Sequence, residues 1–196
     1  MDKPSKYLEQ KLILRFSNDL CNRIDETAQI VHLKKGSTVL YQGEQPVFIY
    51  FVCEGLMRGY YIDEEGNDIT KCFAEEGEFA CSEGLRTPGE ATFSVETMEA
   101  CQCIRIPYAF LSEDLKTDSV ILEVIHRFTQ KALKAAEARE EALLTKSASK
   151  RYLDFQFNKP NLARRLSQKH LASYLGIRPG SLCRIKNQLA DLHLCE

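Results

Sequence analysis

In the first half of the chain, the pattern of hydrophobic and polar positions changes from helical spacing to short strand-like runs. Residues 7–29 carry apolar side chains at helical spacing, and we expect one amphipathic helix there. From Gln29 to Pro107 the apolar residues come in short β-branched and aromatic runs between turn residues, such as VFIYFV and TFSVETM. Many short strands at this spacing predict a jelly roll or β-roll over residues 29–107.

Glycines punctuate this β region. Gly55, Gly66 and Gly77 fall at regular intervals, and Gly66 lies in DEEGND between two expected strands. A polar stretch with a glycine between two such runs is a hairpin signal. We therefore expect a β-hairpin that turns at Gly66.

A long helix is expected after the β region. Asp118 or Ser119 can cap its start, and about 25 residues follow without Gly or Pro. One stripe of positions steps by three and four residues, as in a coiled coil. The predicted seam of a parallel homodimer consists of Ile121, Ile125, Phe128, Ala132, Ala135, Arg139 and Ala142, with Arg139 as its polar interruption. Alternatively, the stripe packs on the β-roll of its own chain.

Two helices joined by a tight corner are expected near the end of the sequence, in LSQKHLASYLGIRPGSLCRIKNQL. Ser167 can cap the first helix, Gly176 can end it in the left-handed conformation, and Pro179 suits the first turn of the second. The outward face of the second helix carries Gly180, Ser181, Arg184, Asn187 and Gln188. This is a helix-turn-helix, whose second helix presents a polar edge that suits the major groove of DNA.

Charge divides the chain into an acidic body and a basic end. Residues 1–118 carry 12 Lys and Arg against 21 Asp and Glu, whereas residues 146–196 carry 10 against 3. A basic segment that coincides with a compact helical pair points to a polyanion as partner. We expect an effector-sensing domain with its N-terminal helix at 1–118, a long dimerisation helix at 119–145 and a DNA-binding domain at 146–196.

The cysteines and the hydropathy exclude several classes of protein. None of the eight cysteines forms a C-x-x-C pair, and Cys101 and Cys103 are expected on one face of a strand as reduced core thiols. No apolar run approaches the roughly 20 residues of a membrane span. The first residues lack the features of a secretory signal. We expect a cytoplasmic protein without a metal and without a membrane partner.

From residue 29 onward the sequence resembles the Crp/Fnr-type transcription regulators. The resemblance rests on LSQKHLASYLGIRPGSLCRIKNQL, on the β region that opens with KKGSTVLYQGE, and on the long helix between them. It implies an α+β protein: an N-terminal β-roll of the cyclic-nucleotide-binding kind, a long dimerisation helix and a C-terminal helix-turn-helix domain. It also implies a homodimer that binds double-stranded DNA, with RNA polymerase as a candidate partner.

The resemblance assigns roles to residues of the corner. Ser167, Gln168, Lys169 and Arg178 fall where family members contact phosphates, and Arg184 falls on the arginine that reads a base edge. Further expected DNA contacts on the outward face are Ser181, Asn187 and Gln188. Two positions depart from the family pattern, because Arg178 replaces the usual Ser or Thr and Gly180 replaces a frequent Glu. These departures predict a DNA-binding domain with relaxed sequence specificity, since phosphate contacts position a protein without distinguishing DNA sequences. Only ADLHLCE follows Leu189, so the resemblance does not extend to the β-hairpin wing that members often have.

The family's cyclic-nucleotide cassette matches this chain poorly. Cys81 and Ser82 stand at its Gly-Glu pair, unless a slip of one residue brings Glu83 there, and Glu90 stands where an arginine would hold the phosphate. A carboxylate without a cation repels a phosphate. Arg86 in the preceding loop is the alternative cation. We expect no cofactor and no binding of cyclic AMP by a pocket whose candidate residues are Phe79, Ser82, Glu83, Arg86 and Thr92.

Two other functions fit less well. A non-enzymatic module that binds an effector or another protein, and whose helix-turn-helix no longer binds DNA, would explain Gly180 and the short segment after Leu189. A cupin-like enzyme would need two or three histidines and a carboxylate inside the barrel, and only His32 lies in the β region. We therefore expect that the protein is not an enzyme.

Overall fold

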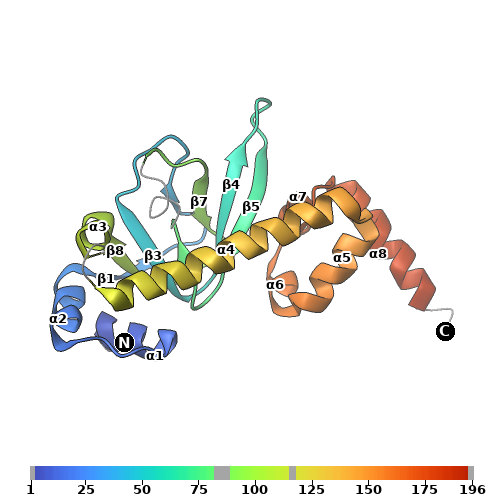
Figure 1. Cartoon of the computed structure of the whole chain (residues 1–196). Helices are drawn as coiled ribbons and strands as arrows, with labels where there is room; N and C mark the ends of the chain where they lie inside the picture. Colours follow the sequence, from blue (N-terminus) through green and yellow to red (C-terminus); the bar gives the residue numbers. More distant parts are fainter. Residues whose placement is uncertain (1–2, 82–88, 115–117, 194–196) are drawn as a thin grey trace. The chain divides into compact units, whose positions relative to one another are not determined.

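The structure is a computed structural model that describes residues 3–81, 89–114 and 118–193 (Figure 1). Its contacts group the chain into two compact units, Met1–Lys131 and Ala132–Glu196. Within the described ranges, none of the helices combines the length and hydropathy that a membrane span requires.

The described residues of the first unit form eight strands, three short helices and the start of a long one. Its strands are β1 (Gln29–Leu33), β2 (Thr38–Leu40), β3 (Phe48–Glu54), β4 (Met57–Ile62), β5 (Asp68–Ala74), β6 (Phe79–Ala80), β7 (Ser94–Thr97) and β8 (Cys101–Pro107). Its helices are α1 (Pro4–Leu12), α2 (Asn18–Thr27), α3 (Tyr108–Asp114) and the first part of α4 (Ser119–Thr145). The described strands lie between Gln29 and Pro107, which are the bounds that the hydrophobic pattern predicted.

The strands form two antiparallel four-stranded sheets. One has the order β1-β8-β3-β6 and the other β2-β7-β4-β5. Successive side chains of β3 belong to two different hydrophobic cores. Ile49, Phe51 and Cys53 belong to the first, and Tyr50 and Val52 belong to the second. The second core fills the space between the sheets, and the first is covered by helices. The predicted β-roll is therefore confirmed, with both faces of the first sheet buried.

The hairpin predicted at Gly66 joins β4 and β5. Gly66 has a φ of 82°, and its N–H donates to the Asp63 carbonyl at 3.0 Å. The Asp63 carboxylate accepts hydrogen bonds from the N–H groups of Glu65 and Asn67 at 3.0 and 2.8 Å. These bonds to the charged carboxylate lower the pKa of Asp63.

The N-terminal region forms two helices where the sequence predicted one continuous helix over residues 7–29. Ile13 ends α1 in the left-handed conformation, with a φ of 58°. Ser17 then begins α2, because its hydroxyl accepts a hydrogen bond from the N–H of Leu20 at 3.1 Å. The break lets Leu12 and Leu20 both face the first sheet, with exposures of 4% and 2%. A single straight helix would have carried its later turns away from this surface.

Helix α4 has the bounds predicted for the long helix, and the Asp118 carboxylate caps it by accepting from the N–H of Val120 at 2.8 Å. The first part of its apolar stripe lies in the core of its own unit. Ile121 is 7% exposed there, and Ile125 and Phe128 pack against the same core. These three side chains are corrected from the dimer seam to the helix-covered face of the first sheet, which needs an apolar cover. Heptad spacing marks an apolar face but does not say which surface covers it.

The remaining residues of the predicted seam differ in their exposure. Ala132 and Ala135 are exposed, whereas Arg139 and Ala142 are half-buried in the second unit. The Arg139 Nε donates to the Tyr174 carbonyl at 3.1 Å, and its guanidinium lies 4.9 Å from the centre of the Tyr174 ring. Arg139 is therefore a packing residue of the second unit, which corrects its place in the seam.

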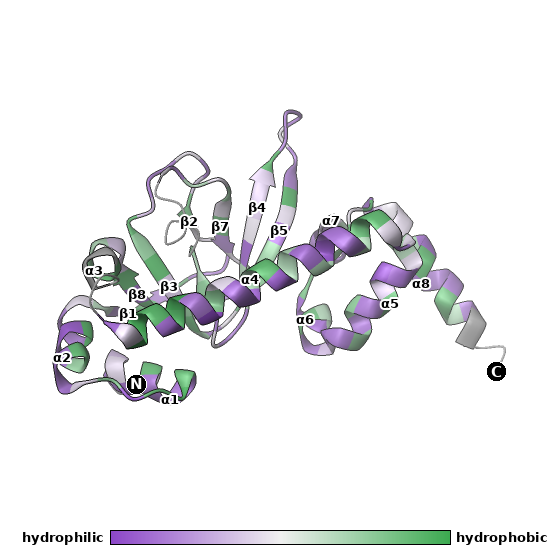
Figure 2. Cartoon of the chain, in the orientation of Figure 1, coloured by the Kyte–Doolittle hydropathy of each residue, from purple (hydrophilic) through white to green (hydrophobic). Residues whose placement is uncertain are grey.

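The second unit continues from α4 with four helices among its described residues. They are α5 (Ala148–Asn158), α6 (Pro160–Arg165), α7 (Gln168–Tyr174) and α8 (Pro179–His193). Ser147 caps α5 by accepting from the N–H of Lys150 at 3.3 Å, and Pro160 occupies the first turn of α6. The pattern of bands in Figure 2 shows hydrophobic and hydrophilic residues alternating along α4 and α5, as amphipathic helices require.

Candidate nucleic-acid interface

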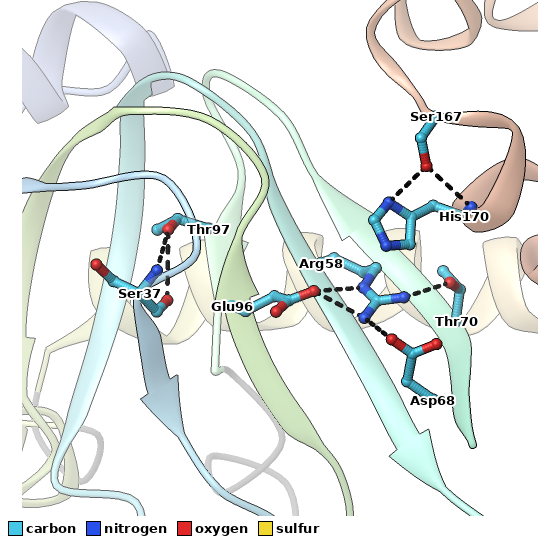
Figure 3. Close-up of polar contacts among 8 residues, drawn as sticks. All are labelled: Ser37, Arg58, Asp68, Thr70, Glu96, Thr97, Ser167 and His170. Atoms are coloured by element: carbon cyan, nitrogen blue, oxygen red, sulfur yellow. Dashed lines mark hydrogen bonds and ion pairs between the residues drawn. The ribbon is translucent and has the colours of Figure 1, made fainter.

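Helix α7 starts at a serine cap, as the sequence predicted. The Ser167 hydroxyl accepts from the N–H of His170 at 3.3 Å and lies 3.0 Å from the Nδ1 of the same histidine (Figure 3). The Ser167 carbonyl accepts the first helical bond, from the N–H of Leu171 at 3.0 Å. The cap satisfies donors that the helix itself leaves without a partner.

The corner between α7 and α8 depends on Gly176. Its φ is 67°, and a Cβ at this position would lie 2.8 Å from the Cδ2 of Leu143. Its N–H donates to the Ser173 carbonyl, and the N–H of Ile177 donates to the Ala172 carbonyl at 3.0 Å. Both the backbone conformation and the close approach of α4 therefore require glycine.

Helix α8 starts directly after this corner. The Arg178 carbonyl accepts hydrogen bonds from the N–H groups of Ser181 and Leu182 at 2.9 and 3.1 Å. Pro179 follows as the first helical residue, where its missing N–H costs nothing. The helix begins as predicted, although residue 178 offers no hydroxyl as a cap.

A small apolar core fixes the angle between the two helices. Five side chains of α7, the corner and α8 are less than 9% exposed, namely Leu171, Ala172, Leu175, Leu182 and Ile185. Leu162 of α6 is 1% exposed beneath them, and the Phe155 ring lies 5.4 Å from that of Tyr174. The inward face is therefore complete without the polar residues of α8.

The residues expected to contact DNA, from the resemblance or from the outward face of the second helix, lie away from this core. Those that are exposed are Ser167, Gln168, Lys169, Arg178, Arg184, Asn187 and Gln188, while Ser181 is half-buried. The Arg184 Nη2 donates to the Ser181 hydroxyl at 3.4 Å, which is a long hydrogen bond. The guanidinium of Arg184 thus lies on the surface, with one weak contact along its own helix.

Part of the basic excess in this unit serves its own structure. The Arg151 Nε donates to the Leu175 carbonyl at 3.0 Å, and its Nη1 donates to the Lys146 carbonyl at 2.6 Å. These bonds hold α5 against the end of α7. The sequence reasoning did not find Arg151, because its signal is only an arginine on an amphipathic helix.

Asp154 pairs with two of the lysines. Its carboxylate lies 2.9 Å from the Nζ of Lys146 and 2.9 Å from that of Lys150. Hydrogen bonds from both lysines lower the pKa of Asp154, and the bond to Asp154 raises the pKa of Lys146. A lowered carboxyl pKa stabilises the fold above the unfolded pKa, and the contribution is lost as the pH falls through the folded pKa. Since Lys150 is exposed and Asp154 and Lys146 are only partly buried, solvent screens these pairs and their effect on stability is small.

Of the proposed effector residues, the structure describes Phe79 and Thr92. Phe79 points toward the helices, where its ring lies 4.9 Å from that of Phe51 and 4.8 Å from that of Phe128. This placement corrects the assignment of Phe79 to a pocket inside the β-roll. Thr92 is exposed. The other three candidates, Ser82, Glu83 and Arg86, lie outside the described residues.

A buried arginine in the β-roll was missed by the sequence reasoning. Arg58 of β4 is 1% exposed, and its guanidinium lies 2.7 Å from Glu96 of β7 and 2.9 Å from Asp68 of β5 (Figure 3). Its Nη1 donates to the Thr70 hydroxyl at 3.1 Å, and the Tyr60 ring lies 4.6 Å away. The arginine ties three strands of the second sheet together. It stands in a run that read as an ordinary strand, so the sequence offered no signal.

Cys101 and Cys103 lie where the sequence predicted, whereas Cys72 and Cys183 are exposed. Cys101 and Cys103 are buried on β8 in the core between the sheets. Burial raises the pKa of Cys81, and burial also raises that of Cys53. These thiols are therefore protonated and unreactive at neutral pH.

Residues 30–118 match the family model of the cyclic nucleotide-binding domain. A transcriptional regulator of the CRP/FNR family from Thermus thermophilus, TTHA1359, has a similar structure with a TM-score of 0.66, 22% identity, and coverage of 83% of this chain and 86% of its own. The chain has the Crp/Fnr fold.

Two other solved structures are similar over a larger share of this chain and have higher TM-scores. FixK2 from Bradyrhizobium japonicum has a TM-score of 0.76 at 19% identity, covering 85% of this chain and 86% of its own. The c-di-GMP responsive global regulator CLP from Xanthomonas campestris has a TM-score of 0.77 at 16% identity, covering 91% and 94%. None of these three similar proteins is described as an enzyme. A search of curated proteins found no match.

The corner between α7 and α8 allows a first prediction about stability. Replacing Gly176 by Ala should lower the free energy of unfolding by about 1–2 kcal/mol, because a Cβ is strained in the left-handed conformation. The matched control is Gly180→Ala, since Gly180 lies in α8 with open space around its Cβ position. That change should stabilise the protein by roughly 0.5–1 kcal/mol. Urea denaturation followed by circular dichroism measures both, and equal effects of the two changes would contradict the assigned role of Gly176.

Proposed function

We propose that the protein is a homodimeric transcriptional regulator whose α7–α8 corner binds double-stranded DNA. The observation that supports this most is the separation of roles on α8. Leu182 and Ile185 complete the apolar core, whereas Arg184, Asn187 and Gln188 are exposed on the other side. Seven of the eight side chains assigned to DNA are exposed. An arginine-bearing polar face on the second helix of such a corner is the feature that enters a major groove.

The chemistry of the exposed groups suggests a division of work. The guanidinium of Arg184 suits the O6 and N7 acceptors of guanine, which an arginine contacts in a bidentate manner. Gln168, Lys169 and Arg178 lie at or just before the starts of α7 and α8 and suit phosphate oxygens. With Gly180 in place of a carboxylate, α8 has one strong base-reading group. We therefore infer a regulator with modest sequence specificity.

A second stripe on α4 supports the homodimer. Leu122, Leu133 and Leu144 are 47%, 42% and 78% exposed. They are spaced by eleven residues, which is close to three helical turns, so they share one face of an α-helix. This face differs from the one that Ile121 buries. We propose that the dimer contact runs along these leucines, whereas Ala132 and Ala135 of the first predicted seam lie about 100° and 160° around the helix from Leu133.

We further propose that the β-roll does not bind cyclic AMP. Glu90 is exposed just before β7, where the family pattern has a cation for the phosphate, and Phe79 faces the helices. The pocket of the β-roll is thus a structural remnant or serves another effector. A calorimetric titration with cyclic AMP should show no binding, and a micromolar affinity would contradict this proposal. RNA polymerase stays a predicted partner.

Substitutions in the corner test the DNA-binding proposal. Arg184→Ala should cost about 1–3 kcal/mol of binding free energy on a preferred site and much less on random DNA, because it removes a base contact. Gln168→Ala should weaken binding to both DNAs by similar factors, because it removes a phosphate contact. Fluorescence anisotropy with a site selected from genomic DNA and with a shuffled duplex measures both.

Arg164→Ala is the matched control for the charge of Arg184. Arg164 is also exposed, but it lies on α6, outside the corner. Its removal should change neither the preference nor, by more than a small factor, the affinity. If Arg184→Ala and Arg164→Ala had the same effect on both DNAs, Arg184 would not be a base-reading residue.

A further inference from the structure

An apolar cavity lies between the first sheet and the helices that cover it. Its volume is about 70 Å³, and its walls come from α1, α2, α3 and α4 and from strands β3, β6 and β8. These elements all belong to the first unit, and Figure 1 shows α1, α2 and the start of α4 gathered on one side of β3 and β8. Thr129 carries the one hydroxyl among the lining side chains, which are otherwise hydrocarbon.

Several contacts beside the cavity join α4 to the first sheet and to α1. The rings of Phe51, Phe79 and Phe128 form a chain of edge-to-face contacts from the sheet to the helix. The Arg127 Nη2 donates to the Leu12 carbonyl at 3.0 Å, which joins α4 to the end of α1. Lys131 forms an ion pair with Glu78, next to β6. Protein interiors are otherwise close-packed and contain few voids larger than a water molecule, so this cavity is an exception.

The lining decides which kind of molecule fits. A buried water needs two to four polar partners, and the side chains of this cavity offer one hydroxyl. Cavities lined by Leu, Ile and Phe stay dry and accept small apolar molecules. Phe16, Phe110 and Thr129 are each half-buried, so part of the lining lies near the protein surface. None of the described residues that line the cavity carries a charged side chain.

We propose that this cavity is a binding site for a short aliphatic molecule with one hydroxyl or carbonyl group. Its hydrocarbon chain lies among the leucine, isoleucine and phenylalanine side chains, and its polar group meets the hydroxyl of Thr129. Binding at this site is separate from DNA binding and does not depend on the function proposed above.

The test uses 1-pentanol as the probe and the full chain labelled with ¹³C at the isoleucine δ-methyl groups. Saturable shifts are expected for the isoleucines that line the cavity, among them Ile49, Ile106 and Ile125. The methyl groups of Ile62 and Ile177, which are not among the lining residues, should not shift. Pentane-1,5-diol has the same chain with a second hydroxyl that the cavity cannot satisfy, and it should cause no saturable shift.

Two matched substitutions on α4 complete the experiment. Val124 lines the cavity and Val120 does not. Val124→Phe should fill the space and abolish the response to 1-pentanol, whereas Val120→Phe should keep it. If the lining isoleucines did not respond in the unmodified protein, or if the diol shifted them as strongly as 1-pentanol, the proposal would be overturned. The comparison of the two alcohols decides the matter even if Val124→Phe does not fold.

Discussion

Replacing Arg58 by Ala should lower the free energy of unfolding by about 3–5 kcal/mol, since breaking a buried ion pair leaves its partners uncompensated. The guanidinium is 1% exposed, and three strands contribute its partners Glu96, Asp68 and Thr70 and the arginine itself. Its loss removes the guanidinium that lies between the carboxylates of Glu96 and Asp68 and leaves a void beneath the Tyr60 ring. Urea denaturation followed by circular dichroism should show a large fall in the transition midpoint.

Arg23→Ala is the matched control for this change. Arg23 lies in the same unit, and its side chain is 41% exposed with Asp19 as an ion-pair partner at 3.9 Å. Surface pairs of this kind contribute less than about 1 kcal/mol. If Arg58→Ala cost no more than Arg23→Ala, the buried cluster would not stabilise the second sheet.

Introducing a charge on the leucine stripe of α4 should have the largest effect on DNA binding. Leu133→Glu should convert the proposed dimer to a monomer, because it would place a carboxylate in an apolar contact between two helices. A monomer binds with one DNA-binding domain only and loses the avidity of two linked domains, which amounts to about 10²–10⁴ in affinity for a duplex with two half-sites. Sedimentation velocity measures the oligomeric state, and anisotropy measures the affinity for a two-half-site duplex.

The control introduces the same residue elsewhere on the same helix. Ala138 is exposed, and at 100° per residue it lies about 140° around the helix from Leu133. Ala138→Glu should leave both the dimer and the affinity nearly unchanged. A dimer that survives Leu133→Glu would show that the contact runs along another surface.

The elements with strong local signals could be predicted from the sequence. Ser167, Gly176 and Pro179 each have a defined local role at a helix end, and the structure places each in that role. The same holds for Asp118 and for the hairpin at Gly66. Such features depend on neighbouring residues in the chain, so a single sequence contains most of the information.

The features that depend on distant partners could not be predicted. Ile121, Ile125 and Phe128 have the spacing of a dimer seam, and the sequence could not decide between that seam and the alternative, packing on the β-roll, which the structure shows for these three residues. Arg58 meets partners on two other strands, and nothing near it in sequence indicates this. The break before Ser17 had a local signal, because Ser-Asn-Asp is a good helix start, but the apolar spacing concealed it.

The salt dependence of DNA binding tests the central claim most directly. A dimer that places Lys169 and Arg178 of both heads on phosphates should show a slope of about −4 in a plot of log affinity against log salt. This corresponds to a loss of roughly a hundredfold in affinity for random duplex DNA between about 50 and 200 mM salt. An affinity that is absent at low salt, or that does not change with salt, would contradict the assignment of the α7–α8 corner to DNA.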